Sequence, residues 1–311
     1  MTIINTLAPV FLLILLGALL VRGGLIPSEV LKGLNKLTYW VALPTVIFHA
    51  LATMTYEPGP AGRIFAVMMA GTFGGAITAL VLGRLIGVSS RSMGTFLQAT
   101  FRGNLAFIGL PVILYAFASE PAALRTEMTT AAILAFAPTM LVYNILAVLV
   151  LLLSSGNDNR GIVGRTVRQL ATNPLVLAAV AGILFSLLDF PLPVALDRSL
   201  EAVGQMALPL ALLCIGGTLI VVRVRGSLAH ATTASLLKVA AIPAIGFAAA
   251  MLLGLSTDEL RVAMILLASP TAAASFVLAQ QLYGDEALAS SSIVISTVLS
   301  LGSLTAVVWL L

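Results

Sequence analysis

The sequence predicts an all-α integral membrane protein with ten transmembrane helices, arranged as two inverted repeats of five helices each. Three observations support this prediction. The composition is extreme, since 60% of the 311 residues are hydrophobic and only 9% are charged. The chain divides into ten apolar runs. Several identical residues, including two prolines, recur at the same spacing in both halves. Soluble domains are about 45–50% apolar and about 25% charged, and disordered chains are more polar still, so both classes are excluded.

The ten apolar runs approach the length needed to cross a bilayer, whose hydrocarbon core of about 30 Å requires roughly 20 helical residues. The first run is assigned as a span and not as a secretory signal, because no Lys or Arg precedes it and no small-residue cleavage site follows before Arg22. The predicted spans are 4–21, 34–53, 64–86, 95–117, 128–153, 173–188, 203–222, 232–254, 261–282 and 287–311.

Charges in the loops predict the orientation of these spans. The loops after spans 1, 3, 5 and 7 hold ten basic and two acidic residues, whereas those after spans 2, 4, 6 and 8 hold four basic and eight acidic residues. Basic residues favour the cytoplasmic side, so both termini are expected outside a plasma membrane, the inner membrane in a bacterium. The first set is Arg22, Lys32, Lys36, Arg84, Arg91, Arg160, Arg165, Arg168, Arg223, Arg225, Glu29 and Asp158, and the second is Arg63, Arg125, Arg198, Arg261, Glu57, Glu120, Glu127, Asp189, Asp197, Glu201, Asp258 and Glu259.

An internal repeat links the two halves at an offset of 165 residues. Two prolines with the same separation occur in both halves, which chance matches among Ala and Leu do not explain. Because each half holds an odd number of spans, the second half must enter the membrane from the opposite side. The matches are Pro9 with Pro174, Leu12 with Leu177, Gly17 with Gly182, and Ala42-Leu43-Pro44 with Ala207-Leu208-Pro209. We expect a first repeat at 1–153, a polar cytoplasmic linker at 154–172 and an inverted second repeat at 173–311.

Spans 4 and 9 correspond in the two repeats, and both contain residues that interrupt helices. Proline removes a backbone donor, and in lipid the freed groups must be satisfied by protein or by water in a cavity. Paired interruptions of this kind typically mark the binding site of a transporter. With a two-residue gap in the repeat, Asn104 matches Thr271. The helix-breaking residues are predicted to be Gly109 and Pro111 in span 4 and Pro270 in span 9.

The residues around these breaks favour an anionic ligand. Half-helix N-termini present unpaired N–H groups and partial positive charge, and the guanidinium of Arg102 can bind a carboxylate through two hydrogen bonds. Two alternatives stay open: Arg102 extends to the cytoplasmic interface or bonds a backbone carbonyl, and Asn104 forms a hydrogen bond between helices. The predicted substrate-binding residues are Arg102, Gly103, Asn104, Ser269, Thr271 and Ser275.

The coupling ion is left open between proton and sodium. His49 in span 2 is a candidate for proton coupling, and its alternative is a neutral imidazole bonded to a neighbouring helix. Lys238 in span 8 is expected to extend to the cytoplasmic interface. No Asp or Glu lies in the middle of a span, which argues against a cation exchanger, although Gln98 and Gln280 leave sodium coupling open. No cofactor, metal cluster or catalytic constellation is expected, so the protein is not predicted to be an enzyme.

Several motifs together resemble one known family. They are Asn104-x-x-x-x-Gly109-x-Pro111-x-x-x-Tyr115 in span 4, Leu43-Pro44 with Phe48-His49 in span 2, and Pro270 with Phe276-Val277-x-Ala279 in span 9. The chain is similar to bacterial members of the auxin efflux carrier family, which includes plant auxin carriers and bacterial malonate carriers. This resemblance implies a mobile crossover domain with broken spans 4 and 9, a scaffold domain that often dimerises, and transport of organic anions. Gly103 and Ser275 stand where the plant carriers have proline, so auxin itself is not expected.

The leading hypothesis is therefore a secondary carrier of small carboxylates, such as a malonate-like dicarboxylate, that works by alternating access. Its expected partners are the lipid bilayer, the organic anion and a second copy of the chain, but not nucleic acid, because the basic residues are scattered singly. The second hypothesis is a sodium-coupled symporter of amphipathic anions such as sterol acids. The third is a membrane sensor that binds a ligand without transporting it. A requirement for sodium would distinguish the second hypothesis from the first. Ligand binding without flux would distinguish the third from both.

Overall fold

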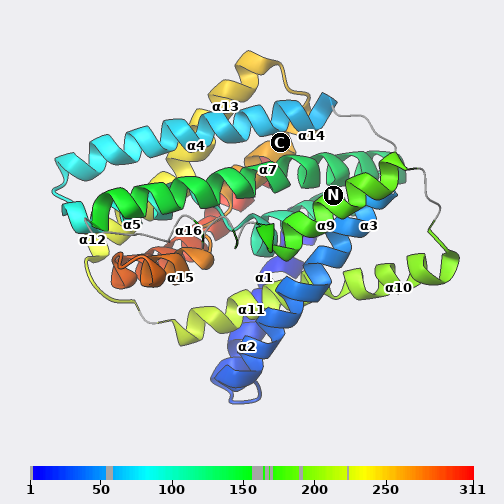
Figure 1. Cartoon of the computed structure of the whole chain (residues 1–311), viewed down its shortest axis with the longest axis horizontal. Coiled ribbons are helices and arrows are strands. Elements are labelled where there is room, and N and C mark those ends of the chain that lie inside the picture. The colour runs from blue at the N-terminus through cyan, green and yellow to red at the C-terminus, as the bar shows by residue number, and fades with distance from the viewer. Residues whose placement is uncertain are drawn as a thin grey trace. The chain divides into compact units, whose positions relative to one another are not determined.

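The computed structural model describes residues 3–53, 59–155, 164, 168, 171–188, 192–222 and 224–311. In these residues all regular elements are helices (Figure 1), which confirms the all-α class. Five helices are long and apolar enough to cross a membrane: Gly59–Leu85, Ala122–Ser154, Val194–Val221, Leu228–Leu253 and Glu286–Leu310. Shorter apolar helices are Ala8–Arg22, Leu105–Ala116 and Pro174–Leu187. The number of ten spans and their inverted arrangement stay predictions.

Several predicted features lie wholly or mostly outside the described residues. Most of the linker 154–172 is one of them. The others are charged residues used for the orientation, namely Glu57, Asp158, Arg160, Arg165, Asp189 and Arg223. Most of the described charges assigned to loops lie inside helices instead. Arg63, for example, lies within α4 (Gly59–Leu85), and Arg125 and Glu127 lie within α7 (Ala122–Ser155). A helix can extend past the hydrocarbon region, since charged side chains in its end turns reach water without leaving the helix.

The helices form two compact units, each built from both halves of the sequence. Unit 1 comprises Met1–Gly62, Ala106–Ala137 and Arg168–Val221, and unit 2 comprises Arg63–Leu105, Pro138–Val167 and Val222–Leu311. One boundary falls inside α7, immediately before Pro138, a residue type that commonly bends helices. The compact units each contain segments of both predicted repeats, so they do not test where one repeat ends and the next begins. The repeat boundaries stay a prediction.

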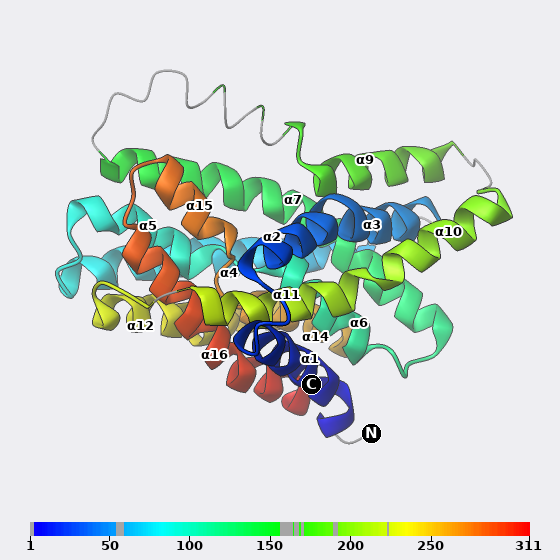
Figure 2. The same ribbon diagram turned by 90° about the horizontal axis from the view of Figure 1, so that it is seen from below.

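Unit 1 is built on two pairs of closely packed helices. α1 (Ile3–Arg22) packs along α11 (Ala207–Val221), and α3 (Leu43–Ala52) packs along α9 (Pro174–Leu187), as Figures 1 and 2 show. Glycines permit this proximity, because a Cβ atom at Gly17 would overlap the backbone of Leu213. The rest of unit 1 includes α2 (Ser28–Leu37), η1 (Thr38–Ala42), α6 (Leu110–Ala116) and α10 (Val194–Gln205).

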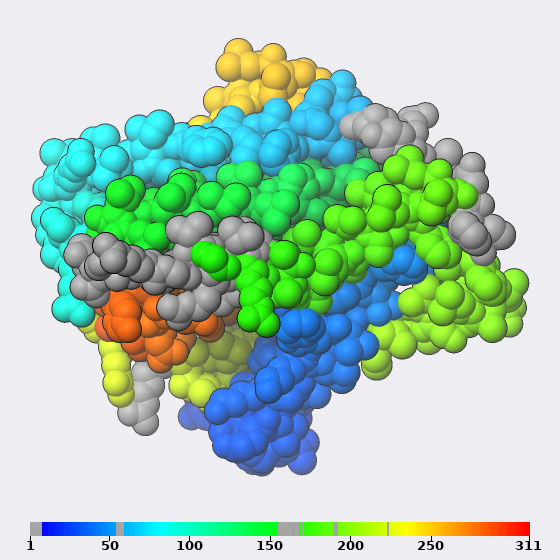
Figure 3. Space-filling view, in the orientation of Figure 1, coloured from blue at the N-terminus to red at the C-terminus, as the bar shows by residue number. Residues whose placement is uncertain are grey.

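Unit 2 contains the long helices α4 and α16 (Glu286–Leu310), with α16 in contact with α5, α12, α14 and α15. The exposed side of α4 carries Phe73, Ile77 and Val81 at four-residue spacing, which places them on one face. Figure 3 shows α4 (cyan) at the surface, where such a face suits contact with lipid. The other helices are α5 (Ser90–Phe101), α12 (Leu228–Leu236), η3 (Leu237–Ala241), α13 (Ile242–Leu253), α14 (Thr257–Ala268) and α15 (Ala274–Gln281).

Three helices widen to a π-helical turn two residues before a proline. The turns η1, η2 (Leu105–Gly109) and η3 precede Pro44, Pro111 and Pro243. In η1 the Leu43 N–H bonds the Thr38 carbonyl, five residues back. Because proline lacks an N–H and its ring crowds the carbonyl four residues earlier, a wider turn lets the helix continue through it.

Candidate functional site

The interruptions of two helices meet in unit 2. The first helix ends with α5 at Phe101 and resumes with η2 at Leu105, and the second ends with α14 at Ala268 and resumes with α15 at Ala274. The two non-helical stretches, 102–104 and 269–273, are called the crossover below. They pair antiparallel, with Gly103 opposite Thr271. The Asn104 N–H donates to the Pro270 carbonyl over 2.7 Å, and the Ala272 N–H donates to the Arg102 carbonyl over 2.9 Å. Each non-helical stretch thus provides hydrogen-bond partners for backbone N–H and carbonyl groups of the other.

The carbonyls at the C-terminal ends of α5 and α14 are satisfied by side chains. Thr271 Oγ1 donates to the Ala99 carbonyl at 2.6 Å, and Lys238 Nζ donates to the Leu267 carbonyl at 2.7 Å. Ser303 Oγ donates to the Ala268 carbonyl at 3.3 Å. Helix ends leave such carbonyls without partners inside the helix, and in a membrane each unsatisfied group is costly. The two helix ends at the crossover are therefore capped by side-chain donors and are not frayed.

Arg102 is the C-terminal capping residue of α5, and its side chain is buried, with 8% exposed. Its Nη2 lies 2.5 Å from Oδ1 of Asn144 on α7. The Asn144 amide in turn donates to the Met140 carbonyl at 2.9 Å, which fixes the orientation of the amide. The burial of Arg102 is incompatible with the alternative that this side chain extends to the membrane surface. Asn144 is a part of the site that sequence reasoning missed, because an amide within an apolar helix has no distinguishing pattern.

The prediction that Lys238 extends to the cytoplasmic interface is wrong. Lys238 lies in η3 and is completely buried, with its ammonium on the Leu267 carbonyl at the end of α14. A Cβ atom at Gly103 would lie 3.4 Å from Lys238 Nζ, so the ammonium is close to both breaks. The sequence position near one end of span 8 suggested an interfacial residue. The direction of the side chain, toward the crossover, depends on the packing of η3.

The predicted hydroxyl residues make different contacts: Ser269 and Thr271 lie in the crossover, and Ser275 lies in α15. The Thr271 hydroxyl donates to the Ala99 carbonyl of α5. Ser269 Oγ donates to the Ile265 carbonyl at 2.9 Å, within the helix that precedes it. Ser275 Oγ is buried and has no hydrogen-bond partner among the described residues, and the same holds for Gln98 Oε1. The Gln98 amide donates to the Ser275 carbonyl at 3.0 Å. Buried polar atoms without partners cost about 1–3 kcal/mol each and are therefore candidates for ligand contact.

α16 supplies further polar groups that sequence reasoning did not single out. Ser296 Oγ accepts the Thr271 N–H at 3.0 Å, and Ser303 bonds the end of α14 as described above. Ser292, Ser296, Ser300 and Ser303 follow one another at helical spacing, which would have indicated a polar face on this otherwise apolar helix.

The predicted helix-breaking residues fall at different points of the two helices. Pro270 lies inside the break after α14. Gly109 ends η2 and Pro111 is the second residue of α6, so both lie in the continuous helix that follows the break of span 4. The non-helical residues of span 4 are 102–104.

His49 belongs to unit 1, where its Nε2 lies 2.7 Å from Oδ1 of Asp197 on α10. Both side chains are partly exposed, at 28% and 43%. The imidazole thus bonds a neighbouring helix, as one of the two alternatives for this residue expected, and its partner there is a carboxylate. Its part in proton coupling stays a prediction.

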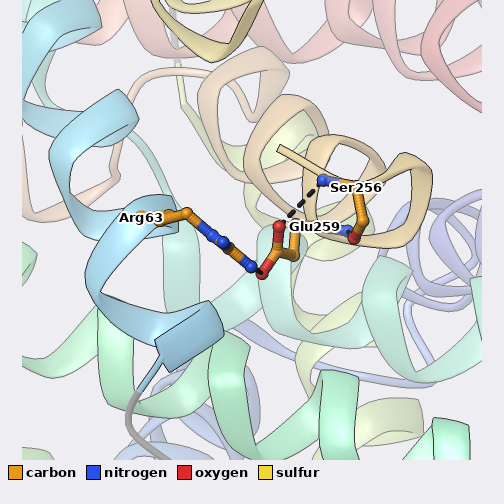
Figure 4. A network of polar contacts seen from close by, with 3 residues as sticks. All are labelled: Arg63, Ser256 and Glu259. Atoms are coloured by element: carbon orange, nitrogen blue, oxygen red, sulfur yellow. Dashed lines mark hydrogen bonds and ion pairs between the residues drawn. The ribbon is translucent and has the colours of Figure 1, made fainter. Parts of the chain in front are cut away.

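An ion pair fixes the start of the half-helix α14 (Figure 4). Arg63 on α4 donates to Glu259 Oε1 through Nη2 at 2.5 Å and Nε at 3.2 Å. Glu259 is buried, and its second oxygen accepts the Ser256 N–H at 2.9 Å while Ser256 Oγ accepts the Glu259 N–H at 3.3 Å. This reciprocal capping box begins α14. The pair therefore joins α4 to the helix that ends at the crossover.

We expect Arg63→Ala to destabilise the protein more than Glu259→Gln does. Removing Arg63 leaves a buried carboxylate without its counter-charge, at a cost of about 2 kcal/mol after allowance for the half-exposed guanidinium. Glutamine at 259 keeps a side-chain oxygen for the Ser256 N–H, so its cost is about 1 kcal/mol. Thermal unfolding of the detergent-purified variants measures both. Arg63→Ala should cost little in the Glu259→Gln background, and an unchanged cost there would contradict the pairing.

Comparison with known proteins identifies the family of the chain. The sequence profile of the family described as membrane transport protein matches residues 2–310. A protein of Rhizobium meliloti (strain 1021) named "Putative malonate transporter" is 28% identical, over 97% of this chain and 94% of its own. A protein of Methanothermobacter thermautotrophicus named "Uncharacterized transporter" is 29% identical, over 96% of this chain and 95% of its own. The chain therefore belongs to this family of multi-pass membrane transport proteins, the auxin efflux carrier family.

Proposed function

We propose that the protein is a secondary carrier that moves small organic anions, carboxylates of the malonate type, across the plasma membrane by alternating access. The observation on which this rests is the crossover itself, two broken helices joined backbone to backbone beside the buried cations Arg102 and Lys238. Transporters use such discontinuous helices to bind a substrate near the middle of the membrane. The name of the Rhizobium relative supports a dicarboxylate as the first substrate to test.

The charges favour an anion over a cation or a neutral solute. Arg102 is held by a neutral amide, and Lys238 by a backbone carbonyl. Adjacent positive charges and charge-assisted hydrogen bonds stabilise a carboxylate, so one that entered the crossover would be stabilised by both groups. The helices that resume at Leu105 and Ala274 begin at the crossover, and their N-terminal ends add partial positive charge.

Different residues of the predicted site are assigned different tasks. Arg102, Asn104 and Ser275 contact the substrate in this proposal. Arg102 supplies a charge, Asn104 supplies an amide, and Ser275 supplies a buried hydroxyl that has no hydrogen-bond partner among the described residues. Thr271 and Ser269 hold the broken backbone, since their hydroxyl protons are used there. Gly103 lies beside Lys238, since a Cβ atom there would be in ordinary contact with the ammonium at 3.4 Å.

The inverted repeat is supported by a pair of matching contacts within unit 1. Gly17 approaches the backbone of Leu213, and a Cβ at Gly182 would lie 2.9 Å from the Phe48 carbonyl. Gly17 and Gly182 are 165 residues apart, and so are Phe48 and Leu213. The offset found in the sequence therefore relates two contacts in space, which is expected if the α1–α11 and α9–α3 pairs are related by a two-fold axis.

The remaining parts of the proposal follow the family resemblance. Unit 2, which holds the crossover, is proposed as the moving transport domain and unit 1 as the scaffold. The scaffold would form the homodimer, and both termini would lie outside. Cross-linking of single cysteines placed on the exposed leucines of α1 tests the dimer in native membranes; the candidate positions are Leu12, Leu15, Leu16 and Leu19.

The test of function is charge displacement on a solid-supported membrane, with jumps of malonate, other small carboxylates and indole acetate applied to proteoliposomes. We expect a saturable current with one carboxylate class. Asn104→Ala should weaken the response about 10- to 100-fold, the value of a hydrogen bond to a charged ligand. Asn35→Ala is the matched control, because among the described residues the Asn35 amide bonds its own helix, at the Leu31 carbonyl.

If a folded Asn104→Ala variant transports at the wild-type rate, Asn104 does not contact the substrate and the proposed site is wrong. If no anion gives a current, counterflow of labelled malonate decides between electroneutral exchange and a protein that binds without flux, which is the sensor hypothesis.

A second candidate, the sodium-coupled symporter of amphipathic anions such as sterol acids, is favoured by one observation. Gln98 Oε1 is a buried oxygen acceptor with no partner among the described residues, and sodium binds oxygen ligands of this kind. A strict requirement for sodium in the same current measurements would select this candidate.

A further inference from the structure

The ammonium of Lys238 stands at the C-terminal end of the half-helix α14. Its Nζ donates to the carbonyl of Leu267, the second-last residue of that helix, and the side chain is completely buried. In carriers with broken helices, unwound carbonyls and half-helix C-terminal ends are the groups that bind the coupling cation. Lys238 thus places a covalently attached cation where a coupling ion would bind.

We propose that Lys238 is the ion-coupling residue of this carrier: its ammonium takes the place of sodium, and its proton is the ion transported with the organic anion. The inference rests on the proposed function and adds the identity of the coupling ion to it. It differs from the sequence expectation, in which His49 was the candidate for proton coupling and Lys238 had no part in transport.

Among the described residues, no carboxylate provides a fixed counter-charge for the Lys238 ammonium. η3 packs against α5, α12, α13, α14 and α16. None of the ion pairs found among the described residues includes Lys238. Arg102 at the crossover is itself a cation, and Glu259 is paired with Arg63. The other titratable or charged groups on these elements lie within the first five residues of their helices or at the N-cap, and α13 has none. They are Arg91, His230, Asp258, Arg261, Asp285 and Glu286.

This arrangement makes the charge on Lys238 depend on the substrate. Burying an ammonium without a counter-ion costs several kcal/mol, whereas an adjacent carboxylate offsets this cost. With the anion bound, the proton therefore stays on Nζ. After the anion leaves, the N–H bond breaks, its electron pair stays on nitrogen and the proton passes to water. The neutral amine still has N–H groups for the Leu267 carbonyl, so the end of α14 stays satisfied and one proton accompanies each anion.

Two fluxes of labelled malonate in proteoliposomes test the proposal separately from the function. Malonate counterflow at equal pH reports binding and alternating access. Uptake driven by an acidic exterior, with the membrane voltage clamped to zero by potassium and valinomycin, reports proton coupling. For wild type we expect both fluxes with choline in place of sodium. A gradient of about one pH unit should give about tenfold accumulation if one proton accompanies each malonate.

Lys238→Arg keeps the charge, but its guanidinium does not release a proton near neutral pH, and Lys238→Gln keeps a donor for the Leu267 carbonyl without a charge. In a variant that retains counterflow, we expect the accumulation driven by the pH gradient to be lost. Persistent accumulation in such a variant, or a sodium requirement in wild type, would overturn the assignment of Lys238 while the carrier function stands. Absence of malonate counterflow in wild type would overturn both.

Should both variants lose counterflow, proton uptake by wild-type protein decides. Malonate is added to detergent-purified protein in weakly buffered solution with an indicator dye, at a pH where malonate is fully ionised. We expect protons to be taken up with the same malonate dependence as binding. Saturable binding without proton uptake would overturn the proposal.

Discussion

Replacing Arg102 with alanine is expected to reduce malonate transport by about 100-fold or more, because it removes a bidentate, charge-assisted contact worth about 3 kcal/mol to a carboxylate. The guanidinium is already buried and oriented by Asn144, so little ordering is needed when the anion binds. Arg102→Lys should retain part of the activity, since lysine keeps the positive charge but not the planar pair of donors.

The measurement is the initial rate of malonate counterflow as a function of concentration. A substrate contact predicts a raised KM in Arg102→Lys with normal thermal stability. A purely structural role of Arg102 would instead lower the melting temperature and the yield of both variants while the remaining protein kept its KM. Arg84→Ala is the matched control, because Arg84 is an exposed arginine in the last turn of α4 and should leave both quantities unchanged.

The second large effect concerns folding: Gly216→Ala is expected to destabilise the protein by at least about 3 kcal/mol. A Cβ atom at Gly216 would overlap the Ile14 carbonyl and crowd the Ala18 nitrogen on α1. These are backbone atoms, so no side-chain rotation relieves the overlap, and α1 would have to move away from α11. We expect a lower melting temperature in detergent and a lower fraction of monodisperse protein.

Gly302→Ala is the control, because this substitution is not expected to destabilise the protein. Gly302 lies within α16 and has open space where a Cβ would be placed. Alanine restricts the unfolded chain and favours a helix, so this change should be neutral or stabilising by about 0.5–1 kcal/mol. Equal melting temperatures for the two variants would contradict the close packing of α1 on α11.

The helices could be predicted from the sequence because length and apolarity are local properties of the chain. Each predicted span contains helix in the described residues, and the errors lie at the ends, where charged residues continue a helix beyond the apolar run. The break in span 9 was predicted at Pro270 because proline cannot donate a backbone hydrogen bond. In span 4 the break precedes Gly109 and Pro111, since a π-helical turn accommodates the proline.

The sequence by itself determined that this chain is a helical membrane protein whose fourth and ninth apolar runs contain polar interruptions, because these properties depend on composition and spacing alone. Only the tertiary structure decided which polar groups those interruptions use. Lys238 is 29 residues from Leu267, and Thr271 is 172 residues from Ala99, so no local pattern couples them. Such pairs form because helix packing leaves buried carbonyls that must find donors, and the donor is chosen by position in space.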